Sequence, residues 1–173
     1  MPIDIRGLAP LLGVFDMQRS VRFYRDVLGF ELVSTSAPGN DFGWALLRRG
    51  GAELMLNILH GDGESPSTPD PARIAAHRDT ALFFGCPDLD AAYAHLRAHG
   101  VDAEEPFVQG YGMKQLYLRD PDGYTLCFQW PASQETADQW REWYGLEVEE
   151  AEETGQTVEM EDRVSPAGIV PSG

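Results

Sequence analysis

The chain has 173 residues and a formal net charge of −15, and 43% of its residues are hydrophobic and 10% aromatic. That length and composition fit one folded domain, or two very small ones, and exclude disorder along the whole chain. The acidic balance argues against a nucleic-acid partner, which needs clustered basic side chains, and no apolar run of about 18 residues predicts a membrane span.

The first part of the chain predicts a strand, a helix and three further strands. Residues 8–15 form a short apolar run of strand length, and Asp16 is placed to cap a helix that Gly29 ends. Strand-like runs at 44–48 and 52–58 are separated by a glycine turn. Residues 8–59 therefore read as one βαβββ module.

A second copy of this pattern follows at a constant offset of 72 residues. Asp88 takes the capping position of Asp16, Gly100 ends the second helix, and residues 116–120 and 122–128 fall on 44–48 and 50–56. Several matches at one offset predict a duplication. We expect an α+β domain over 1–131, in which two tandem βαβββ modules (8–59 and 80–130) form a cup-shaped or barrel-like sheet.

The segment between the modules, residues 60–79, is rich in Gly, Pro and Ser. This composition predicts a linker with one helical turn near 72–76, and a lid over a site is the alternative.

The remainder of the chain predicts a helix and a tail. Residues 132–145 place Ala137, Trp140, Trp143 and Tyr144 on one helix face, which is typical of a docking surface. Residues 132–173 carry 11 acidic and two basic residues, a net charge of −9. We therefore expect 146–173 to be a solvated, disordered acidic tail.

Two stretches of sequence resemble the vicinal oxygen chelate superfamily, the glyoxalase/bleomycin resistance protein/dioxygenase family. They are Asp16-Met-Gln-Arg-Ser-Val-Arg-Phe-Tyr24 and the turn Asp120-Pro-Asp-Gly123 with the strand after it. The resemblance covers residues 8–130 and leaves out the acidic tail. It implies paired half-cups that enclose a ligand cavity, and a homodimer.

Enzymes of this superfamily hold a divalent metal on the first and last strands of each module. The resemblance places those four positions at Ala9, Met55, Ala81 and Cys127. None of these side chains is the hard nitrogen or oxygen ligand that such chemistry uses, and alanine has no donor atom. We therefore expect no metal and no cofactor, and a pattern closest to the non-metal, bleomycin-resistance-like members.

Four histidines are the other possible metal ligands. Glu53 with His60 or His77 could rebuild a site, although both histidines are expected to be exposed loop residues. His95 and His99 have the i, i+4 spacing of a chelating pair, but no third ligand accompanies them. A solvated pair is the preferred interpretation.

Strand alternation predicts which side chains line the cup, because successive residues point to opposite faces. Glu53 is then a lone carboxylate on the cavity side. Aromatic and amide side chains around one carboxylate favour a small organic ligand, cationic or aromatic, and a collapsed core is the alternative. The predicted ligand-binding residues are Glu53, Met55, Asn57, Phe83, Tyr111, Gln115, Tyr117, Cys127 and Gln129.

Together these features predict a protein that sequesters a small organic molecule, an antibiotic among the candidates, without a metal. No catalytic residue is assigned. One alternative is a metal-dependent lyase or dioxygenase with substituted ligands, and another is an interaction module whose acidic tail docks a basic partner. Two cysteines are too few for a disulfide scaffold and no Sec-type signal is visible, so a cytoplasmic location is expected.

Overall fold

The computed structural model describes residues 3, 7–58 and 70–144. Of residues 142–144 it describes the backbone only. The first module is a βαβββ unit in which a π-helical turn, η1, continues the helix. Its elements are β1 (Leu11–Val14), α1 (Met17–Arg22), η1 (Phe23–Val27), β2 (Glu31–Thr35), β3 (Trp44–Arg49) and β4 (Ala52–Ile58).

The second module repeats this order after a short helix, and a last helix follows it. The elements are α2 (Pro71–His77), β5 (Ala81–Gly85), α3 (Leu89–Ala98), β6 (Phe107–Val108), β7 (Met113–Arg119), β8 (Thr125–Pro131) and α4 (Gln134–Tyr144). The side chains of Asp16 and Asp88 cap α1 and α3, each accepting from the backbone N–H three residues on.

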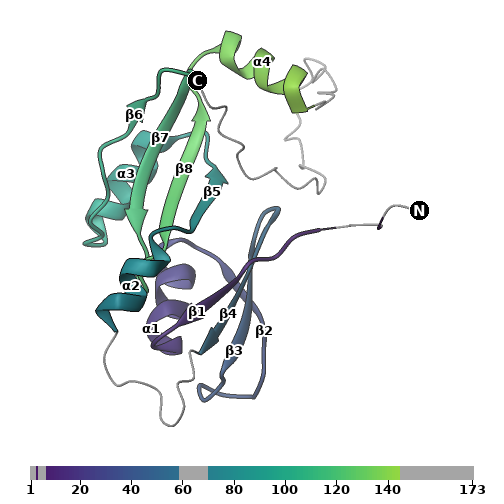
Figure 1. Cartoon of the computed structure of the whole chain (residues 1–173), viewed down its shortest axis with the longest axis vertical. Helices are drawn as coiled ribbons and strands as arrows, with labels where there is room; N and C mark the ends of the chain where they lie inside the picture. Colours follow the sequence, from purple (N-terminus) through teal and green to yellow (C-terminus); the bar gives the residue numbers. More distant parts are fainter. Residues whose placement is uncertain (1–2, 4–6, 59–69, 145–173) are drawn as a thin grey trace.

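Two four-stranded mixed sheets result, with the equivalent orders β1-β4-β3-β2 (sheet A) and β5-β8-β7-β6 (sheet B). In each sheet the first strand pairs in parallel with the last, and the last two strands form an antiparallel hairpin. The duplicated α+β architecture is thus confirmed. The two sheets lie one above the other in the view of Figure 1 and are not closed into a barrel.

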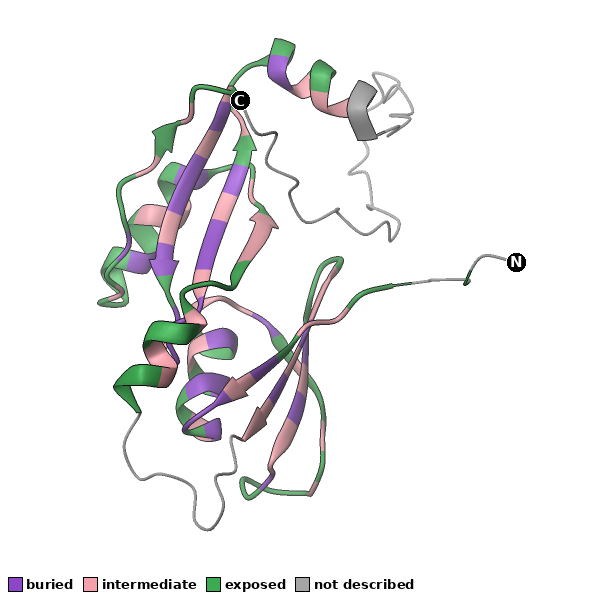
Figure 2. Ribbon diagram, viewed as in Figure 1, coloured by how far each residue is buried: buried purple, intermediate pink, exposed green. Residues whose placement is uncertain are grey.

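Each sheet packs one face against the helices of the modules. The opposite face is partly exposed on sheet A, whereas on sheet B it also holds the buried residues Met113, Gln115, Cys127 and Gln129. Along β4, Leu54 and Leu56 are buried, whereas Glu53, Met55 and Asn57, which alternate with them, are partly exposed. Figure 2 shows more continuous burial along β7 and β8, because in each strand two neighbouring residues that point to opposite faces are buried, Gln115 and Leu116 on β7 and Leu126 and Cys127 on β8. The hydrophobic core holds the buried strand residues together with residues of α1, η1 and α3. We call the opposite face of each sheet its open face.

The Asp-Pro-Asp-Gly turn between β7 and β8 joins the two modules. Asp122 accepts hydrogen bonds from the backbone N–H of Phe15 (2.8 Å) and the hydroxyl of Ser20 (2.5 Å). Asp120 accepts one from the hydroxyl of Tyr24 (2.7 Å). Because all three donors lie in the first module, this turn fixes how the two sheets are placed.

The segments outside the two modules are only partly described. Residues 59–69 of the predicted linker and the tail 146–173 lie outside the described residues. The α4 helix packs near the turn before β7, where a Cβ on Gly112 would lie 2.3 Å from the Thr136 hydroxyl. In the part of the chain that the structure describes, no helix is long and apolar enough to cross a membrane.

Candidate functional site

The open face of sheet B gathers six of the predicted ligand-binding residues. Gln115 and Tyr117 stand on β7, Cys127 and Gln129 on β8, and Phe83 on β5. The register places Cys127 between Phe83 on one side and Tyr117 on the other, and Gln129 directly beside Gln115. Tyr111 lies in the turn before β7 and is exposed.

A chain of amide hydrogen bonds crosses this face. The Gln109 amide donates to Gln115 Oε1 (2.9 Å), and Gln115 Nε2 donates to Gln129 Oε1 (2.8 Å). The Tyr117 hydroxyl also donates to Gln115 Oε1, at 2.8 Å. Gln115 and Gln129 are only 1% and 7% exposed. Buried amides are costly unless they are bonded, so this network holds the side chains of the open face in fixed positions.

The cluster carries no charge at neutral pH. Burial raises the pKa of the Cys127 thiol to about 11, so the thiol keeps its proton. Burial also raises the pKa of the Tyr117 phenol well above its ordinary value. A protonated, buried thiol is a poor nucleophile, and its chemistry is that of a small apolar group.

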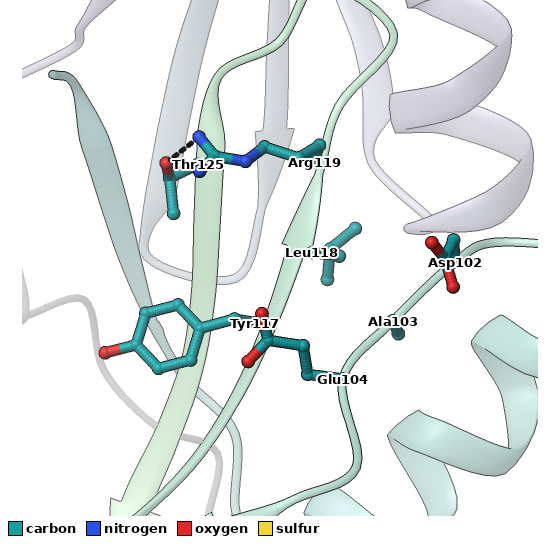
Figure 3. Close-up of a pocket in the computed structure, with 7 residues that line it drawn as sticks. All are labelled: Asp102, Ala103, Glu104, Tyr117, Leu118, Arg119 and Thr125. Carbon is teal, nitrogen blue, oxygen red and sulfur yellow. Dashed lines mark hydrogen bonds between the residues drawn. The ribbon is translucent and has the colours of Figure 1, made fainter. Parts of the chain in front are cut away.

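A hollow of about 340 Å³ adjoins this cluster at the far end of β7. Its lining includes Tyr117, Arg119 and Thr125 from the open face and Asp102 and Glu104 from the loop before β6. Figure 3 shows Arg119 reaching across to the neighbouring strand, where its guanidinium donates to the hydroxyl of Thr125. The hollow therefore carries both signs of charge.

The other predicted site residues lie on sheet A, apart from this cluster. Met55 and Asn57 occupy its open face, as expected, and the Asn57 amide bonds to the Ile58 carbonyl (3.2 Å). Glu53 is on the same face, but its description as a lone carboxylate is wrong: Arg48 on β3 forms an ion pair with it at 2.5 Å. Among the described residues, no hydrogen bond or ring contact joins the predicted site residues on sheet A to the cluster on sheet B.

The four family positions do not fit a divalent metal. Ala9 and Ala81 offer no donor atom, Met55 offers a thioether, and the thiol of Cys127 stays protonated. Hard divalent ions need oxygen or imidazole ligands. Within the described residues, no group of three or more His, Cys, Asp or Glu side chains could hold a metal ion.

The histidines have structural partners instead. His77 was expected in an exposed loop, and this is wrong: it ends α2, bonds through Nδ1 to the Asp122 carbonyl (2.7 Å) and stacks on Tyr124 with ring centroids 4.2 Å apart. His95 bonds to the Val27 carbonyl at 2.8 Å, and His99 to the His95 carbonyl at 2.8 Å. His60 lies outside the described residues.

Two residues of the cluster escaped the sequence analysis. Gln109 reaches the amide chain from the loop before β7, and Phe107 on β6 stacks on Tyr117 with ring centroids 6.1 Å apart. Strand alternation could not find them, because β6 is only two residues long and Gln109 lies in a turn. The signal that could have found them is their position. Both residues lie beside a glycine-rich turn that leads into a strand with alternating polar residues.

Comparison with known proteins finds relatives by sequence. The chain is 33% identical over 114 residues to the uncharacterized protein YaeR of Escherichia coli K12, a match that covers 64% of this chain and 84% of that protein. It is 31% identical over 128 residues to the lactoylglutathione lyase of Haemophilus influenzae, covering 70% of this chain and 89% of that enzyme.

Among solved structures, the bleomycin resistance determinant encoded on transposon Tn5 superposes with a TM-score of 0.57 at 24% identity, over 75% of this chain and all of that one. This likeness concerns the fold. A family model described as the Glyoxalase/Bleomycin resistance protein/Dioxygenase superfamily matches residues 8–128. Since that match spans more than half of the chain, the protein belongs to the Glyoxalase/Bleomycin resistance protein/Dioxygenase superfamily.

Proposed function

We propose that this protein binds a small organic molecule on the open face of sheet B, without a metal and without chemical conversion. The observation that carries the proposal is the pair Gln115 and Gln129, buried and bonded to each other on the sheet face that the helices leave free. A face that served only as a packed wall would not need two buried amides and a phenol. Aromatic walls with a few fixed polar groups are typical of ligand sites.

The proposed ligand is an organic compound of the size of a drug, antibiotics included. The fold supports this class of ligand, because a bleomycin resistance determinant has the same fold. Both cysteines are free thiols, which favours a reducing compartment such as the cytoplasm.

The functional form is proposed to be a homodimer in which the second copy covers the open faces. Apolar side chains that water reaches on β1, on β6 and in the turn before β7 support this arrangement, since exposed apolar patches mark association surfaces. They are Leu11, Phe107, Val108 and Tyr111. Size-exclusion chromatography with light scattering should give twice the chain mass of 19.2 kDa, and a monomer at high concentration would contradict the dimer.

Isothermal titration calorimetry against a panel of aromatic, cationic and aliphatic drugs tests the binding itself. We expect saturable binding of at least one compound, unchanged by a chelator, and loss of that binding in Phe83→Ala. Tyr93→Ala is the matched control, because Tyr93 is a partly buried aromatic residue of α3 that packs against the core. Flat titrations over the whole panel would refute the proposal.

A second candidate function is a metal-dependent lyase, which the 31% identity to a lactoylglutathione lyase favours. The family ligand positions argue against it, and the substitutes Glu53 and His77 are bonded to Arg48 and Asp122. The test is turnover of lactoylglutathione by the purified chain with added Mg²⁺, Zn²⁺, Ni²⁺ or Fe²⁺. Metal-dependent turnover that Glu53→Ala abolishes would establish this function in place of binding alone.

A further inference from the structure

Two histidines at the C-terminal end of α3 lie against each other at the surface of the protein. His95 and His99 are four residues apart, which places them on the same side of the helix. Both residues are exposed, and the centroids of their rings are 4.2 Å apart. Arg97 lies between them in the sequence, but residues two apart on a helix point in different directions, and Arg97 pairs with Asp102 at 3.4 Å. The two imidazoles are therefore direct neighbours.

Hydrogen bonds to backbone carbonyls determine which nitrogen of each ring carries the proton. His95 Nε2 lies 2.8 Å from the carbonyl oxygen of Val27, and His99 Nδ1 lies 2.8 Å from the carbonyl oxygen of His95. A carbonyl oxygen only accepts, so each of these nitrogens is the one that donates. In the neutral rings the lone pairs are then on His95 Nδ1 and His99 Nε2. Among the described residues neither of these two nitrogens has a hydrogen-bond partner.

This arrangement of hydrogen bonds is typical of histidines that bind metal ions. A metal-ligating imidazole binds the ion through one nitrogen and donates the N–H of the other to a carbonyl or a carboxylate, which fixes the orientation of the ring. Both rings of the pair already make that second bond. Metal–nitrogen bonds of about 2.0–2.1 Å let one ion join two nitrogens up to about 4 Å apart, and neighbouring rings with this centroid distance can present two nitrogens within that span.

The ion that suits two imidazoles and water is Cu²⁺. It binds nitrogen ligands more tightly than the other divalent ions of the first transition row, and it accepts a tetragonal set of nitrogen and oxygen ligands. Mg²⁺ and Ca²⁺ need oxygen ligands instead. No group of three His, Cys, Asp or Glu ligands exists among the described residues, so water would complete the coordination. The partial negative charge at the C-terminal end of a helix also favours a cation there.

We infer that His95 and His99 form a surface site for Cu²⁺, bound through His95 Nδ1 and His99 Nε2. This inference goes beyond the proposed function and does not rest on it, because α3 packs against the face of sheet B opposite its open face (Figure 1). The four family positions remain without a metal. Because His95 also donates to Val27 in η1, an ion held at this site would strengthen a contact between the two modules.

Electron paramagnetic resonance of the full-length protein with one equivalent of Cu²⁺ tests the ligand set. We expect hyperfine coupling of the copper signal to two imidazole nitrogens. The chain has 28 Asp and Glu residues, which offer oxygen ligands only. A spectrum with oxygen ligands alone would therefore overturn the inference.

Isothermal titration calorimetry with Cu²⁺ tests the two histidines separately. His95→Gln and His99→Gln keep a side-chain donor for the carbonyl oxygen but remove the imidazole lone pair, so each should weaken Cu²⁺ binding at least about tenfold. The matched controls are His60→Gln and Cys86→Ser, which remove an imidazole and a free thiol elsewhere in the chain and should leave the affinity unchanged.

Circular dichroism checks that each variant is folded. Unchanged Cu²⁺ affinity in folded His95→Gln and His99→Gln protein would overturn the inference, and so would an equal loss of affinity in the controls. If His95→Gln fails to fold because its contact with Val27 is weakened, His99→Gln and the spectrum of the unmodified protein still decide.

Discussion

The hydroxyl of Tyr24, on the helix of the first module, donates a hydrogen bond of 2.7 Å to the carboxylate of Asp120, 96 residues further along the chain. Both groups are buried. The same carboxylate accepts hydrogen bonds from the backbone N–H of Asp122 (3.0 Å) and of Tyr124 (2.8 Å). It therefore stabilises the turn between β7 and β8 and also binds that turn to the first module. This contact therefore helps to fix the position of the two modules, and of their open faces, relative to each other.

Removing the Tyr24 hydroxyl should destabilise the fold. Tyr24→Phe keeps the packing of the ring but leaves a buried carboxylate without one of its donors, which costs about 1–3 kcal/mol. Urea unfolding followed by circular dichroism measures the loss. Tyr93→Phe is the control, because the Tyr93 hydroxyl has no hydrogen bond among the described residues, and an equal loss in both variants would contradict the importance of the Tyr24–Asp120 contact.

The stability of the protein should depend on pH through Asp120. Burial raises the pKa of this carboxyl to about 6, above the ordinary value of about 3.9. Because the folded state then holds the proton more tightly than the unfolded state, the contribution is present below about pH 4 and is lost as the pH rises through 6. Its size is at most about 3 kcal/mol.

Asp120→Asn isolates this contribution. The amide oxygen can still accept from the backbone and its nitrogen can donate to Tyr24, but the residue no longer titrates. The free energy of unfolding of the unmodified protein, relative to the variant, should therefore increase as the pH is lowered from 7.5 to 4. A difference that stays constant over this range would refute the assignment.

The sequence predicted the local structure well because each local signal acts over a few residues. The period of two along β4 and β8 placed Met55, Asn57, Cys127 and Gln129 on the open faces, and Asp16 and Asp88 capped their helices. The offset of 72 residues predicted two equivalent sheets.

What the sequence could not predict depends on contacts between distant segments. The stacking of His77 on Tyr124 joins α2 to the residue just before β8, and no periodicity in the sequence predicts this contact. The separation of the two sheets depends on the contacts of Asp120 and Asp122 with residues about a hundred positions away. The ion pair of Glu53 was accessible in principle, because the short hairpin after Arg48 sets these two residues opposite each other.

The thiol of Cys127 should react slowly with alkylating reagents. Its pKa of about 11 leaves very little thiolate at pH 8, and the side chain is fully buried. Mass spectrometry after iodoacetamide treatment should find Cys86, which is partly exposed, modified before Cys127. Unfolding in urea should remove the difference, and rapid modification of Cys127 in the folded protein would contradict the uncharged character of the site.

The glycine of the Asp-Pro-Asp-Gly turn should tolerate replacement poorly. Gly123 has a φ of +91°, and a Cβ there would lie 2.8 Å from the Ile74 side chain and 3.1 Å from the Ile74 carbonyl oxygen. Alanine would strain the turn and push α2 away, for a loss of more than about 2 kcal/mol. Gly50→Ala is the matched control: its φ is +53° but a Cβ there meets nothing within 4 Å, so only about 1 kcal/mol is expected. Urea unfolding compares the two variants, and faster hydrogen exchange at the α2 amides in Gly123→Ala alone would locate the damage. Equal losses would mean that the contact with Ile74 contributes nothing and that backbone strain accounts for the whole effect.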